Sequence, residues 1–117
     1  MAAFQTVHAG ATRTVPPSAV VWINRRQAIV ATMGTDGRIS TCEINRGLEP
    51  ELPYLALVVR AIGDRERVVI LGPSSIRLAL EREYVAVYRR SERLVDVEPA
   101  GALEAEELVG RLHALAG

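Results

Sequence analysis

Two short apolar runs, residues 19–23 and 28–33, come first in the part of the chain that predicts regular structure. Both are rich in Val and Ile and are apolar at successive positions, which is typical of strands covered on both faces. The polar residues 24–27 between them predict a tight hairpin. Asp-Gly at 36–37 predicts a second hairpin, because this pair readily adopts the positive φ that such turns need. The returning strand, residues 38–45, is polar enough to be an edge strand.

Helical spacings of apolar residues alternate with short apolar runs in the second half of the chain. The predicted elements are a helix over 53–62, a strand over 67–71, a helix over 76–88, a strand over 94–98 and a helix over 102–115. This order, βββαβαβα, predicts an α/β fold, a three-layer α/β/α sandwich with a mixed sheet. Pro16-Pro17 divides the chain into a flexible tail, residues 1–17, and one domain, residues 18–117.

Size and composition limit the classes of protein to consider. The chain has 117 residues, of which 49% are hydrophobic and 24% are charged, as expected of one globular domain with a substantial core. Cys42 is the single cysteine, so the fold does not depend on an internal disulfide and suits a reducing compartment. The longest apolar runs are far too short for a membrane helix. We therefore expect a cytoplasmic domain without membrane contact.

Fourteen arginines balance fourteen acidic residues, so no overall charge draws the chain to nucleic acid, and we expect no sequence-specific DNA binding. The charge is uneven, however, with five arginines against two acidic residues up to position 48 and one against four after position 97. Candidate contacts with a partner or with RNA are Arg25 and Arg26 in the first hairpin loop and Arg89, Arg90 and Arg93 after the second helix. The alternative for Arg89 and Arg90 is that they complement the dipole of that helix.

The turn between the fourth strand and the second helix is a candidate anion-binding site. Gly72, Ser74 and Ser75 lie where a strand ends and a helix begins, a geometry that presents free N–H groups and a positive dipole. Arg77 is the charged residue nearest to this turn. The alternative is a structural turn in which Ser74 or Ser75 caps the helix, because the segment matches no nucleotide-binding motif.

Catalytic chemistry has little support in the sequence. His8, Cys42 and His113 share no metal-ligand spacing, and no nucleophile motif of the Gly-x-Ser-x-Gly type occurs. We therefore predict no catalytic residue, no metal site and no cofactor.

The chain resembles a known protein family in three segments, which are residues 20–28 (VVWINRRQA), 69–73 (VILGP) and 94–100 (LVDVEPA). Over about residues 18–116 it is similar to stand-alone bacterial relatives of the C-terminal domain of Pelota and of the archaeal and eukaryotic class-1 translation release factor. Asn24 stands where that family usually has Asp, and Ser74 stands where it usually has Gly. Because Ser carries a Cβ, the turn at Ser74 should approach a ligand backbone less closely.

This resemblance implies a binding module. In release factors a Gly-Gly-Gln loop on another domain carries peptide release, and this chain has no Gly-Gly-Gln. The C-terminal domain instead docks a partner translational GTPase and helps to seat the factor on the ribosome. We therefore expect a translation-associated adaptor that contacts the ribosome or a translation factor. Two alternatives stay open: a protein-interaction or homodimerisation module joined along the third strand or the first helix, and a small enzyme with an anion site at residues 72–75.

Overall fold

The computed structural model describes residues 14–116, and it confirms the predicted order of elements. The strands are β1 (Ser18–Ile23), β2 (Gln27–Met33), β3 (Ile39–Asn45), β4 (Arg67–Gly72) and β5 (Leu94–Pro99). The helices are α2 (Glu51–Ile62), α3 (Ile76–Tyr88) and α4 (Ala105–Ala116). A short 3-10 helix, η1 (Ser91–Arg93), precedes β5 and has no counterpart among the predicted elements.

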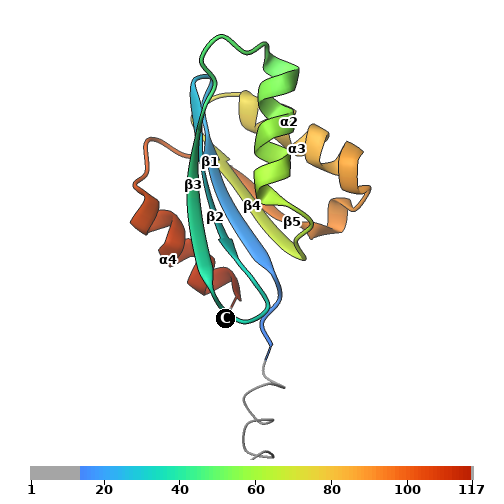
Figure 1. Ribbon diagram of the computed structural model, residues 1–117, viewed down its shortest axis with the longest axis vertical. Coiled ribbons are helices and arrows are strands. Elements are labelled where there is room, and N and C mark those ends of the chain that lie inside the picture. The colour runs from blue at the N-terminus through green and yellow to red at the C-terminus, as the bar shows by residue number, and fades with distance from the viewer. Residues whose placement is uncertain (1–13, 117) are drawn as a thin grey trace, which may run out of the picture.

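The five strands form one mixed sheet in the order β3-β2-β1-β4-β5 (Figure 1). β1, β2 and β3 pair antiparallel, whereas β4 pairs parallel with β1 and β5 pairs parallel with β4. The third strand is therefore an edge, as predicted. The carboxyl ends of the parallel strands β1, β4 and β5 lie at one end of the sheet, which is also the end that carries the β1–β2 loop.

Helices α2 and α3 cover one face of the sheet and α4 covers the other, which confirms the three-layer α/β/α sandwich (Figure 1). β1 lies between the two cores, and all of its residues are buried. Ala19, Val21 and Ile23 belong to the core under α2 and α3, whereas Val20 and Trp22 belong to the core under α4. This arrangement explains why the strand is apolar at successive positions.

Two helices begin at positions that differ slightly from the prediction. α2 begins just before Pro53, which still lies in the first turn, where the missing N–H of proline costs no helical hydrogen bond. α4 begins at Ala105, later than predicted, because Glu107 Oε1 accepts a hydrogen bond from Glu104 N at 2.9 Å. This bond satisfies a backbone N–H at the helix start, as in a capping box.

The expected tail over residues 1–17 falls within the described residues only from residue 14 onward. There, Val15 N donates a hydrogen bond to Thr35 O at 3.1 Å, and Glu66 N donates to Pro17 O at 2.8 Å. The last residues of that segment are therefore attached to the domain by backbone hydrogen bonds.

Candidate functional site

The β4–α3 turn, predicted as an anion site, is closed on both sides by backbone contacts. A Cβ added at Gly72 would lie 2.2 Å from the carbonyl oxygen of Ile23, so only glycine fits at this position. On the other side, Ala100 N donates a hydrogen bond to Gly72 O at 2.9 Å. At the carboxyl ends of the parallel strands, where open α/β sheets commonly bind ligands, β4 is therefore held close to β1 on one side and to the residue after β5 on the other.

The serines of this turn do not cap α3 as expected. Ser75 is the N-cap residue, but its side chain makes no capping hydrogen bond, and its φ of −65° and ψ of −8° are helical. A capping side chain reaches the free N–H groups from an extended conformation, which Ser75 lacks. Arg77 Nη1 donates to Ser74 O at 2.8 Å, while Ser74 Oγ and Arg77 Nε are buried without a partner among residues 14–116. Anion binding by these residues stays a prediction.

Arg25 and Arg26 occupy the β1–β2 loop, which Asn24 holds in a fixed shape. Asn24 Oδ1 accepts hydrogen bonds from the backbone N–H groups of Arg26 and Gln27, each at 2.8 Å. This is an Asx turn, and it leaves both arginines exposed at the end of the sheet. An Asp side chain can accept the same two bonds, so the departure from the family pattern at position 24 leaves the loop intact.

A third arginine, Arg46, joins the β1–β2 loop to the β3–α2 loop. Its backbone N donates to Arg26 O at 2.8 Å, and its guanidinium donates to Arg25 O at 3.2 Å and to Glu49 O at 2.7 Å. The guanidinium carbon also lies 5.6 Å from the centroid of the Tyr54 ring, within the range of a cation–π contact. The two loops therefore form one connected surface.

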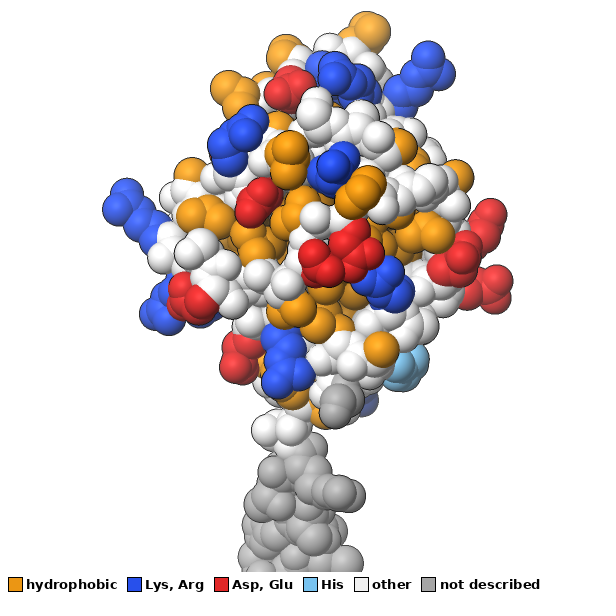
Figure 2. Space-filling view, turned by 180° about the vertical axis from the view of Figure 1, so that it is seen from behind, with side chains coloured by type: hydrophobic (Ala, Val, Ile, Leu, Met, Phe, Trp, Pro, Cys, Tyr) orange, Lys and Arg blue, Asp and Glu red, His pale blue; other side chains and the backbone are white. Residues whose placement is uncertain are grey.

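Two exposed leucines extend this surface. Leu48 in the β3–α2 loop is fully exposed, and Leu52 in the first turn of α2 is 65% exposed. We call the set of Arg25, Arg26, Arg46, Leu48 and Leu52 the hairpin end. Figure 2 shows basic and hydrophobic side chains, with acidic atoms beside them, at the top of the molecule, where these loops lie.

The predicted site did not include Arg46 or the two leucines. A signal for Arg46 was available, because two successive hairpins place the residue that follows β3 beside the loop between β1 and β2. No local pattern identified the two leucines as surface residues, because the position of Leu52 fits the apolar stripe of a helix equally well.

Tyr54 lies beneath the hairpin end and supports it. The Tyr54 hydroxyl donates a hydrogen bond to Asn24 O at 3.0 Å. Burial raises the pKa of this hydroxyl from 10.0 to about 12, and the nearby Arg46 guanidinium acts in the opposite direction. The folded state therefore favours the neutral hydroxyl. The resulting stabilisation is complete below about pH 10 and is lost as the pH rises through about 12.

We expect the free energy of unfolding to fall by up to about 2 kcal/mol between about pH 9 and about pH 12, as measured by urea unfolding. Tyr54→Phe should show a smaller fall over the same interval, because it removes one of the groups that must ionise. Some loss should remain, since burial also raises the pKa of Tyr84. An equal fall in the wild type and in Tyr54→Phe would contradict this account.

The other three predicted contact residues lie at the opposite end of the sheet. Arg89 ends α3 in a left-handed conformation with a φ of 59°, and Arg93 directly precedes β5. Arg90 pairs with Glu92 at 3.7 Å, and Arg93 pairs with Asp64. The predicted contact residues thus form two separate groups, and acidic neighbours offset part of the charge of this second one. Partner binding by this group stays a prediction.

The described residues contain neither a metal-binding cluster nor a membrane-spanning helix. Within residues 14–116, no three His, Cys, Asp or Glu side chains lie close enough together to hold a metal ion. None of the helices in that range is long and apolar enough to cross a membrane. The hairpin end is therefore the candidate site that the structure defines best.

Fold and site together define a class of protein: a small α/β/α domain that presents projecting loops at the end of the sheet where its parallel strands have their carboxyl ends. Similar solved structures identify the fold more narrowly. The Pelota protein of Archaeoglobus fulgidus matches with a TM-score of 0.64 at 11% sequence identity, covering 96% of this chain and 35% of the Pelota chain. The Pelota protein of Thermoplasma acidophilum matches with a TM-score of 0.62 at 19% identity, covering 94% and 36% respectively. The chain has the fold of the C-terminal domain of Pelota.

These matches confirm the expected resemblance at the level of the fold. The chain spans about a third of the length of each Pelota protein. No protein-family model matches the chain. No curated protein matches its sequence.

Proposed function

We propose that this domain is a non-catalytic binding module that contacts the ribosome or a translation factor through the hairpin end. The observation that carries the proposal is the gathering of three arginines and two exposed leucines on two adjoining loops and the first turn of α2, at one end of the sheet. The fold supports it, because the C-terminal domain of Pelota is a translation-associated domain. Such a role places the protein in the cytoplasm.

The arginines suit contact with phosphate or carboxylate groups, which a guanidinium binds through two parallel hydrogen bonds. Among residues 14–116, neither Arg25 nor Arg26 takes part in a salt bridge. Their loop is held by the Asx turn of Asn24 and by the hydrogen bonds of Arg46. Little backbone freedom is therefore lost when a partner binds, which favours affinity.

The leucines distinguish this surface from a purely electrostatic one. Burying an exposed leucine side chain contributes about 2 kcal/mol. An apolar centre beside arginines is also the composition that protein interfaces favour. The hairpin end therefore fits a partner that offers an apolar recess bordered by acidic or phosphate groups, as a ribosomal surface of protein and RNA can.

Closure of the carboxyl edge of the sheet also supports binding over catalysis. Enzyme sites are usually concave and bring several polar groups together around a substrate. Here Gly72 lies against Ile23 on one side and is hydrogen-bonded to Ala100 on the other, so the ends of the parallel strands are held close together. The hairpin end projects beyond this closed edge.

Arg25→Glu combined with Arg26→Glu is expected to weaken co-sedimentation with purified ribosomes about tenfold or more, because it reverses two charges at the contact. Wild-type binding should itself weaken about tenfold to hundredfold between about 50 and 200 mM salt, as counterions compete for the phosphates. The measurement is the fraction of protein pelleted at increasing ribosome concentration.

Arg60→Glu combined with Arg82→Glu is the matched control, since it makes the same change in net charge at exposed positions on α2 and α3. It should bind nearly as the wild type does. Leu48→Ser should weaken binding without altering its salt dependence.

Affinity capture from a native extract with and without nuclease separates an RNA-dependent contact from a contact with a protein factor. Equal losses in the two charge-reversal variants, or wild-type protein that binds neither ribosomes at low salt nor a translation factor, would overturn the proposal.

A further inference from the structure

Strand β3 is an edge strand that lacks the usual protection against pairing. Among the described residues it pairs only with β2, in a register that is continuous along its whole length. Its sequence, ISTCEIN, contains no proline or lysine and only one charged residue, Glu43. The other edge strand, β5, is better protected: it ends at Pro99, carries Asp96 and Glu98, and has an irregular register with β4. Natural proteins use such features to block edge pairing, and β3 has only the single charge of Glu43.

The backbone groups of β3 that point away from β2 can be assigned from two hydrogen bonds. Arg46 N donates to Arg26 O, and Gly34 N donates to Arg38 O, so both pairs are hydrogen-bonded pairs of the β2–β3 ladder. In an antiparallel ladder such pairs alternate with non-hydrogen-bonded ones, so the even-numbered residues of β3 bond to β2. The N–H and C=O groups that face outward belong to Ile39, Thr41, Glu43 and Asn45.

We propose that a second copy of this chain pairs antiparallel with β3 and continues the sheet across a two-fold axis. In the register that joins all seven residues, Ile39 faces Asn45 and Thr41 faces Glu43, and all of these carry outward backbone groups. Cys42 then lies on the axis opposite its own copy. Like charges are kept apart, because Glu43 faces a threonine, whereas a shift of the axis to Glu43 would place that carboxylate opposite itself.

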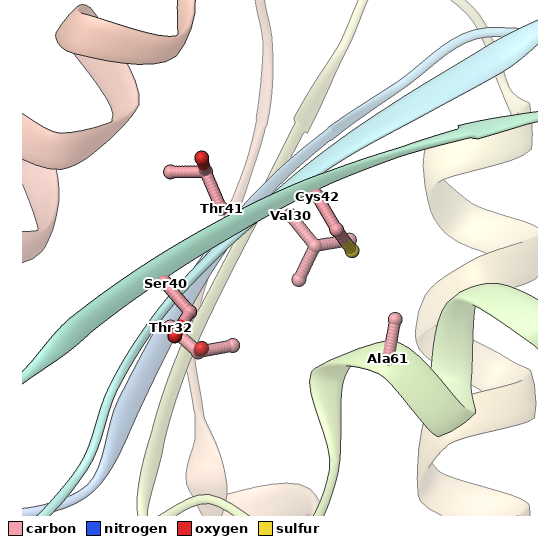
Figure 3. Close-up of a pocket in the computed structure, with 6 residues that line it drawn as sticks. All are labelled: Val30, Thr32, Ser40, Thr41, Cys42 and Ala61. Atoms are coloured by element: carbon pink, nitrogen blue, oxygen red, sulfur yellow. The ribbon is translucent and has the colours of Figure 1, made fainter.

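The uncovered surface beside β3 supports pairing with a second copy of the chain. Figure 3 shows Ser40 and Cys42 on the side of the sheet that carries Ala61 of α2, whereas Thr41 points to the other side. A cavity of about 160 Å³ lies in this space between β3 and α2. Leu57, one helical turn before Ala61, is 40% exposed and belongs to the same helix face as Ala61. A two-fold axis at Cys42 would bring two such surfaces together on one face of the continuous sheet.

Cross-linking through Cys42 tests this register directly. In the proposed pairing the two Cys42 residues form a non-hydrogen-bonded pair with Cα atoms about 4.5 Å apart, within the range of about 4.4–6.8 Å that a disulfide can bridge. Oxidation of the full chain with copper–phenanthroline should therefore yield a covalent dimer. The control is Thr41→Cys combined with Cys42→Ser. Its two thiols would be diagonal neighbours roughly 7–8 Å apart, and it should cross-link far more slowly although it is equally exposed.

A pair of charge variants tests the same register without oxidation. Thr41→Glu would face Glu43 of the other copy at two symmetric places and is expected to raise the dimer dissociation constant at least tenfold. Thr41→Lys would face the same carboxylates and should leave that constant unchanged or lower it. Sedimentation velocity under reducing conditions gives both values, and because position 41 is exposed the circular dichroism spectra of both variants should match the wild type.

Three outcomes would overturn the proposal: wild-type protein that stays monomeric at high concentration, equal effects of Thr41→Glu and Thr41→Lys, or cross-linking through position 41 as fast as through Cys42. The proposal is independent of the hairpin end, because antiparallel pairing places the two hairpin ends at opposite ends of the joined sheet. Arg25→Glu with Arg26→Glu should accordingly leave the dimer dissociation constant unchanged.

Discussion

Gly72→Ala is expected to lower the free energy of unfolding by about 3 kcal/mol or more, as overpacking against rigid backbone does. The new Cβ would lie 2.2 Å from the carbonyl oxygen of Ile23 and 3.3 Å from its carbonyl carbon. β1 cannot move away, because it is paired with β2 on one side and β4 on the other and all of its residues are buried. The substitution should therefore force β1 and β4 apart near their carboxyl ends.

Urea unfolding followed by tryptophan emission measures this effect. Trp22, the single tryptophan, is 4% exposed, and its Nε1 donates to Gly101 O at 2.8 Å near the same end of the sheet. The control is Gly110→Ala on the exposed side of α4, where an added Cβ meets no atom within 4 Å outside its own helix. That variant should be more stable by about 0.5–1 kcal/mol, since alanine favours helix. A Gly72→Ala protein as stable as the wild type would show that the two strands are not fixed in this way.

Tyr84→Phe is expected to lower the free energy of unfolding by about 2–3 kcal/mol, although it removes a single oxygen atom. Tyr84 is fully buried, and its hydroxyl donates to Gly63 O at 2.9 Å and accepts from Arg65 N at 3.2 Å. Both partners belong to the connection between α2 and β4. Phenylalanine would leave a carbonyl and an N–H without this partner, and unpaired polar groups that are removed from water are costly.

Tyr88→Phe is the matched control for this change. Tyr88 is on the same helix, its ring centroid lies 4.8 Å from that of Tyr84, and it is only partly buried. Loss of its hydroxyl should change the free energy of unfolding by less than about 0.5 kcal/mol. Urea unfolding of the two variants provides the comparison, and equal losses would show that the hydrogen bonds of Tyr84 are not what stabilises the connection.

The order of the elements and the three layers could be predicted from the sequence because they follow from local patterns. Successive apolar positions identified β1 as a strand covered on both faces, and spacings of three and four residues identified the helices. Predictions from residue type alone failed where the backbone conformation decides whether a hydrogen bond forms. Ser75 is a residue type that caps helices well, yet its helical φ and ψ prevent the capping bond.

The candidate site could be predicted only in part, because it depends on which loops meet. Arg25 and Arg26 are adjacent in sequence, but Arg46 and Leu48 join them only through the pairing of β3 with β2. The arginines at 89–93 are separated from this group for a similar reason. Because β5 runs parallel to β4, its first residue lies at the far end of the sheet. Counting charges along the chain does not reveal either relationship.

The central strand, β1, also determines how the domain unfolds. The core under α2 and α3 and the core under α4 share no side chain, and cores that are separate in this way can melt separately. Each nevertheless takes alternate residues of β1, so neither can lose this strand without exposing the other. β2 and β4 also contribute residues to both cores, so the thermodynamic coupling between the layers runs through the three central strands of the sheet. This predicts a single cooperative unit rather than two regions that open independently.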